Sequence, residues 1–136
     1  MEIQVNYLAV LIASIVPMII GGLWYSPLLF AKQFMALIGK TEEELKKGFN
    51  PARDYGLSFV SSLVMSFVLA HFVHYAQAST IAGGLQAGFW SWLGFVVTTN
   101  SSTVIFEQRK SGLYFLNMGY NLICLLIMGA ILAVWR

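Results

Sequence analysis

The side chains with the greatest chemical capacity in this chain are amides and hydroxyls inside long uncharged stretches. Asn117 and Asn121 are four residues apart, so on a helix they share one face. An unpaired amide in an apolar medium costs several kcal/mol, so each of them needs a hydrogen-bond partner. Neither is accompanied by a nucleophile with its base or by paired carboxylates. The pattern predicts binding through hydrogen bonds, and we expect no enzymatic activity and no cofactor.

Other polar side chains fall at about the same expected depth as these two amides. The candidate ligand-binding residues are Thr98, Thr99, Asn100, Asn117, Asn121, Trp92 and Ser62. One interpretation is that they bond helices to one another, where such a group contributes about 0.6 kcal/mol in a membrane. The other is that they line a polar cavity open to one side, with the Trp92 indole N–H as one of its donors. The sequence leaves both interpretations open.

Two histidines are the only conventional ionisable side chains inside the uncharged stretches. His71 and His74 are three residues apart and share a helix face. Such a pair has the chemistry of a metal site or a proton relay. No carboxylate accompanies them and Cys124 is the only thiol, so a metal would need ligands from another copy. We favour interfacial histidines beside Phe72 and Tyr75, with a metal or proton role as the alternative.

The elements that position these residues follow from three stretches without Asp, Glu, Lys or Arg. The two longest run from 3 to 31 and from 55 to 106, and a third, from 111 to 135, contains Asn117 and Asn121. A helix needs about 20 apolar residues to cross a bilayer. Only 10% of the chain is charged, against roughly 25% in an average soluble domain. We predict a single all-α domain over 1–136, a bundle of four transmembrane helices. The expected spans are 7–24, 55–76, 80–106 and 113–135.

The basic residues predict how these spans are oriented. Seven of the eight lie in the two loops that share one side of a four-span topology: Lys32, Lys40, Lys46, Lys47, Arg53, Arg109 and Lys110. Basic loops stay in the cytoplasm, so both termini are expected outside. The start of the chain has no basic region, so we expect a retained first helix. The net charge of +2 is too small and too confined to loops to indicate nucleic-acid binding.

The first cytoplasmic loop, about 28–54, is expected to be structured. Residues 28–38 predict a short helix in the headgroup plane that ends at Gly39. Thr41 and Glu44 form a capping box that opens a second short helix. Asn50 is the expected cap of the helix after it.

Small residues recur along one face of every expected span, which favours close packing of the helices. In the third span Gly84 and Gly88 form such a pair. The sequence does not decide whether this face meets a neighbouring span or a second copy. Because four closely packed helices leave little room for a path, we expect a homo-oligomer, most simply a dimer.

One stretch carries a more specific signal, Gly21-Gly22-Leu23-Trp24-Tyr25-Ser26-Pro27. It resembles the signature of a bacterial domain-of-unknown-function family of small four-helix membrane proteins. Further matches are Trp92-Leu93-Gly94-Phe95 followed by Thr98, Phe106-Glu107, Asn117-x-Gly119-Tyr120, and Gly129. The resemblance covers essentially the whole chain and implies four spans in a bacterial inner membrane, but it implies no activity. Small multidrug-resistance transporters have a similar size, but they carry an acid in the first helix that this chain lacks.

Two functions from different classes fit these observations. The first is an oligomeric membrane protein that binds or passes a small, neutral or weakly polar solute through the inner polar residues. The alternative is an accessory subunit whose small-residue faces dock another membrane protein or a lipid. The two functions differ in whether Asn117 and Asn121 are accessible to water, since only the first needs a hydrated cavity.

Overall fold

The computed structural model describes residues 4–135, in which every regular element is a helix. Arg136, the eighth basic residue, lies outside the described residues. Three helices are long and apolar enough to cross a membrane: α1 (Tyr7–Trp24), α4 (Pro51–Tyr75) and α8 (Ser111–Val134). The first has the predicted bounds. The other two begin earlier than predicted, and for α4 the reason is local, because Asn50 caps the helix and Pro51 occupies its first position.

The segment expected as the third span is helical over nearly the predicted range but is interrupted. It consists of α5 (Ile81–Ser91), the π-helix η1 (Trp92–Val97), α6 (Thr98–Asn100) and α7 (Ser102–Ile105). Side-chain hydroxyls bond carbonyls along this irregular stretch, as Ser91 does to Ala87 at 2.8 Å. Such bonds are how a helix inside a membrane keeps an irregular backbone satisfied. Because of the interruption, three helices rather than four have the length of a membrane span.

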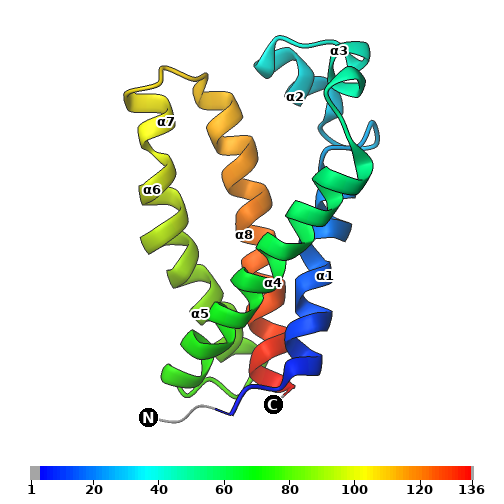
Figure 1. Ribbon diagram of the computed structural model, residues 1–136. Helices are drawn as coiled ribbons and strands as arrows, with labels where there is room; N and C mark the ends of the chain where they lie inside the picture. The colour runs from blue at the N-terminus through cyan, green and yellow to red at the C-terminus, as the bar shows by residue number, and fades with distance from the viewer. Residues whose placement is uncertain (1–3, 136) are drawn as a thin grey trace.

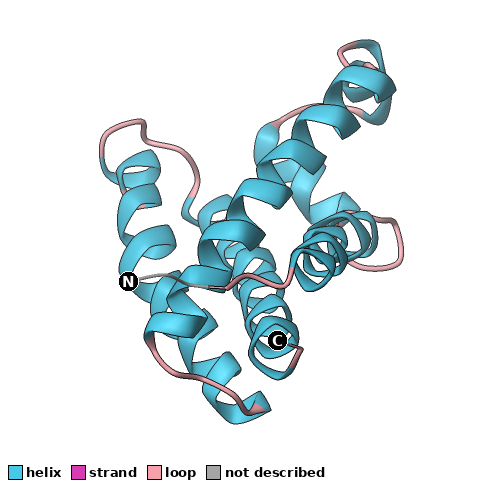
Figure 2. Ribbon diagram, turned by 60° about the horizontal axis from the view of Figure 1, so that its bottom comes forward, coloured by secondary structure: helices cyan, strands magenta, loops and turns pink. Residues whose placement is uncertain are grey.

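Helix α8 contacts α1, α4 and α5, and where it ends, near the mark C in Figure 2, other helices lie on both sides of it. The closest approach is between α5 and α8. A Cβ added to Gly84 would collide with the backbone of Gly129, and one added to Gly88 would collide with the carbonyl of Leu125. The small-residue face of the third segment therefore meets α8 of the same chain, which settles the choice that the sequence left open for this face.

The core between α1 and α4 is built from small side chains. Ala13 and Ser14 of α1 and Ser66 of α4 are fully buried. The Ser66 hydroxyl donates to the carbonyl of Val10 at 2.8 Å. This bond joins the first two long helices where their small, buried side chains meet.

Both charged loops lie at one end of the molecule. Helices α2 (Ala31–Ile38) and α3 (Glu42–Lys47) and the turn between α7 and α8 are at the top of Figure 1, whereas α1 begins and α8 ends at the bottom. The predicted end of the first loop helix at Gly39 and the predicted caps Thr41 and Asn50 are confirmed, but α2 begins at Ala31, three residues later than the predicted helix. Gly39 ends α2 with a φ of 71°, and the Thr41 and Asn50 side chains accept from the backbone N–H groups of Glu44 and Arg53.

Large apolar side chains cover the outside of the bundle. Examples that are at least a third exposed are Ile15, Ile19, Val60, Val64, Phe67, Ile123 and Ile127. A water-soluble monomer rarely exposes a continuous apolar surface of this kind. The long apolar helices and this surface are typical of a membrane protein.

Candidate functional site

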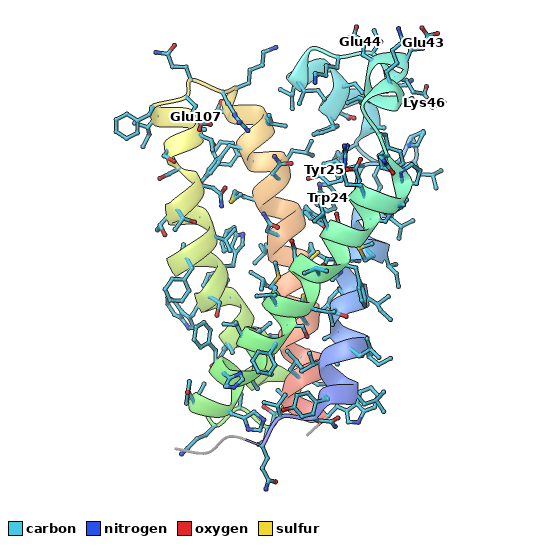
Figure 3. All side chains as sticks on the ribbon, viewed as in Figure 1. Trp24, Tyr25, Glu43, Glu44, Lys46 and Glu107 are labelled. Carbon is cyan, nitrogen blue, oxygen red and sulfur yellow. The ribbon has the colours of Figure 1, made fainter. Side chains whose placement is uncertain are left out.

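The last residues of α1 bond directly to the first half of α8. The Trp24 indole N–H donates to the carbonyl of Leu116 at 3.1 Å. The next residue, Tyr25, donates its hydroxyl proton to Oδ1 of Asn117 at 2.6 Å. Both aromatic side chains lie below α2 and α3, between α8 and the upper end of α4 (Figure 3). The two hydrogen bonds fix the charged-loop end of α1 against α8.

Two glycines make this contact close enough. A Cβ on Gly21 would lie 3.1 Å from the hydroxyl of Tyr120, and a Cβ on Gly119 would lie 3.2 Å from the Trp24 ring. The Tyr120 hydroxyl itself donates to the carbonyl of Pro17 at 2.7 Å. The 21–27 motif and the 117–120 motif, which are far apart in the sequence, are thus two sides of one contact.

The last two residues of the 21–27 motif, Ser26 and Pro27, do not contact α8 through a hydrogen bond. The Ser26 hydroxyl donates to the Leu23 carbonyl of its own helix at 2.6 Å, and Pro27 is exposed at the start of the following turn. They end α1 and direct the chain into the loop.

A cavity of about 760 Å³ lies beside this contact, towards the charged loops. Its polar lining includes Ser58, Asn100, Thr103, Arg109, Asn117 and Asn121, with Tyr25, Tyr114 and Tyr120 among the aromatic residues around them. The candidates Asn100, Asn117 and Asn121 are therefore brought together, from α6 and α8. Ser62 lies in an adjoining hollow of about 310 Å³, which Tyr120 and Asn121 also line.

The three amides differ in how the protein satisfies them. Asn100 donates from Nδ2 to the carbonyl of Val96 at 2.8 Å, and Asn117 accepts from Tyr25. No described residue forms a hydrogen bond with the side chain of Asn121, which is not fully buried. Its side chain lines both the cavity and the adjoining hollow.

Besides Ser62, three of the candidate residues lie outside the lining of this cavity. The Trp92 indole N–H donates to the carbonyl of Met118 at 2.9 Å and joins η1 to α8. The hydroxyls of Thr98 and Thr99 donate to the carbonyls of Gly94 and Phe95 in their own helical segment. These three side chains serve the irregular backbone of the third segment and its contact with α8.

The histidines lie near the opposite end of α4. Nδ1 of His71 is 2.8 Å from the carbonyl oxygen of Phe67, and the two rings are in edge contact at 4.6 Å. Across residues 4–135, no three His, Cys, Asp or Glu side chains are grouped to hold a metal ion. His71 and His74 therefore do not belong to the polar cavity.

Sequence reasoning did not assign Tyr25, Tyr114 or Arg109 to the site. A tyrosine at the end of a span is typical of the membrane boundary, but Tyr25 and Tyr114 both line the cavity, and Tyr114 donates to the carbonyl of Val97 at 2.7 Å. Arg109 lies at the mouth and pairs with Glu107 at 3.0 Å. The sequence signal that could have placed Tyr25 in the site is its position along the helix, because the 21–27 and 117–120 motifs lie at the same level of two adjacent helices.

Comparison with known proteins matches residues 8–133 to a family described as "Protein of unknown function (DUF1761)". No curated protein and no solved structure matches the chain.

Proposed function

We propose that this chain, which belongs to the DUF1761 family of unknown function, is a membrane protein that binds a small, uncharged or weakly polar solute in the cavity beside Asn117. The observation that carries the proposal is the convergence of three amides, Asn100, Asn117 and Asn121, on one cavity. Its volume of about 760 Å³ lies within the range of small-molecule sites, roughly 300–1,000 Å³. Arg109 is the one charged residue in the lining, and Glu107 balances it.

In this proposal the chain crosses a bacterial inner membrane four times, and the broken segment from Ile81 to Ile105 is the third span. Two features support it. This segment follows α4 and precedes α8 in the chain, and it runs from the terminal end of the molecule back to the charged-loop end (Figure 1). It contains no charged residue. By the distribution of basic residues the charged loops face the cytoplasm. The cavity would then open inward, because Phe49 and Arg109 of those loops contribute to its lining.

Assembly into a homo-oligomer remains part of the proposal. The faces of Gly84 and Gly88 are occupied by α8, so an interface between copies would use the outer apolar surface. Passage of a solute across the whole membrane would need such an assembly, because the buried core of α1, α4 and α8 closes the other half of the bundle. Binding from the cytoplasmic side needs only one copy.

Thiol labelling tests whether the cavity is open to water. In a Cys124→Ala background, Asn121→Cys is expected to react with a small water-soluble thiosulfonate reagent added to the cytoplasmic side of inverted vesicles. The matched control is Ile123→Cys, two residues further along α8, where the side chain faces outward and hydrocarbon keeps the thiol from ionising. Reaction at 121 but not at 123 supports the proposal. Equal absence of reaction at both positions would favour an accessory subunit with a dry polar core.

A further inference from the structure

The hydrogen bonds around the cavity orient two of its three amides in opposite senses. Oδ1 of Asn117 accepts from the Tyr25 hydroxyl at 2.6 Å, which leaves its Nδ2 group as the end available to a ligand. Nδ2 of Asn100 donates to the Val96 carbonyl at 2.8 Å, which leaves its Oδ1 atom available. A flip of Asn100 would place two acceptors against each other. In this arrangement the lining presents a donor on α8 and an acceptor on α6.

From this arrangement we infer the chemical class of the solute: an uncharged molecule with a planar group that both accepts and donates hydrogen bonds, such as a primary carboxamide or a urea. Its carbonyl oxygen accepts from Nδ2 of Asn117, and its N–H donates to Oδ1 of Asn100. Asn121, which has no hydrogen-bond partner among the described side chains, adapts to the rest of the molecule. This inference rests on the proposed function.

Charged isosteres fit this lining poorly. A carboxylate has only acceptors and would oppose Oδ1 of Asn100, whereas an amidinium has only donors and would oppose Nδ2 of Asn117. Either ion would also lose hydration without a free counter-charge, because Arg109 and Glu107 already pair at 3.0 Å. The lining therefore selects by hydrogen-bond pattern as well as by charge.

Three planar isosteres test the inference directly. Acetamide, acetate and acetamidinium have nearly the same shape but carry a mixed, an acceptor-only and a donor-only edge. The reporter is Ser58→Cys in the Cys124→Ala background, since Ser58 lines the cavity and all three amides stay in place. The readout is the rate of labelling by N-ethylmaleimide in inverted vesicles at equal concentrations of each isostere. We expect acetamide to slow labelling about fivefold more than either ion, the factor that one hydrogen bond contributes.

Two further variants connect the selectivity to Asn117. Asn117→Asp replaces the donor by an acceptor, so protection is expected to pass from acetamide to acetamidinium. Gln108→Glu makes the same chemical change in the exposed turn outside the cavity and is expected to keep the acetamide preference.

The outcomes separate this inference from the proposed function. If Ser58→Cys does not react at all, the cavity is dry, and both the inferred solute class and the proposed function are wrong. If it reacts but the three isosteres protect equally, or an ion protects best, the cavity remains a solute site and the inferred class is wrong. If Gln108→Glu shifts the preference as Asn117→Asp does, surface charge rather than the amide sets selectivity, and the inference is likewise overturned.

Discussion

Replacing Gly88 by alanine is expected to destabilise the folded protein by about 2 kcal/mol, because the added methyl group overpacks the contact between α5 and α8. Helix propensity alone would act in the opposite direction, since alanine favours a helix over glycine by about 1 kcal/mol. The obstacle to Gly88→Ala is the Leu125 carbonyl, which belongs to the backbone of α8 and cannot move aside as a flexible side chain would. The measurement is the midpoint of unfolding in detergent.

Gly94→Ala is the matched control for this prediction. It adds the same methyl group to the same segment, but a Cβ at Gly94 meets nothing within 4 Å. Its midpoint is expected to stay the same or to rise. Similar losses in the two variants would show that backbone flexibility, and not the approach of α5 to α8, is what glycine provides here.

Trp24→Ala is expected to cost about 2 kcal/mol and to loosen the charged-loop end of α1. The variant loses the hydrogen bond to the Leu116 carbonyl and the contact with the Phe30 ring, whose centroid is 4.7 Å away. Trp24→Phe keeps most of the packing and should lose only the hydrogen bond, about 1 kcal/mol. The unfolding midpoints of the two variants measure both steps.

Trp90→Ala controls for the general effect of losing an indole. Trp90 is 64% exposed on the outside of α5, where lipid replaces the contacts that are lost, so its midpoint should change little. If Trp90→Ala lowers the unfolding midpoint as much as Trp24→Ala does, the contact of Trp24 with α8 is not the reason for the loss of stability in Trp24→Ala.

The sequence was sufficient for the features that depend on short-range chemistry. The bounds of α1, the ends of α2 at Gly39 and the caps at Thr41 and Asn50 follow from apolar length, a left-handed glycine and side-chain oxygens near backbone N–H groups. The grouping of the basic residues at one end likewise follows from where the charge-free stretches lie.

The roles of the polar residues in the third segment depend on the neighbouring helices as well as on the local sequence. Trp92 reaches the Met118 carbonyl across 26 positions of sequence, and the hydroxyls of Thr98 and Thr99 bond carbonyls of the segment to which they belong. By composition these residues are equally suited to lining a cavity, so the choice between the two roles needs the positions of the neighbouring helices.

The candidate site could likewise be predicted from the sequence only in part. Asn117 and Asn121 were identified because an amide in an apolar stretch is costly, and this argument needs no structure. The role of Tyr25 was not identified, since a tyrosine at the end of a span is typical of the membrane boundary. Its bond to Asn117 joins positions 92 residues apart.

The direction in which the cavity opens follows from whether the third segment crosses the membrane. The most direct measurement is the side on which each chain end lies, from periplasm-active and cytoplasm-active reporters fused separately to the start and to the end of the chain. Four crossings predict both ends outside the cytoplasm. Ends on opposite sides would show three crossings by α1, α4 and α8, and would contradict the proposed topology.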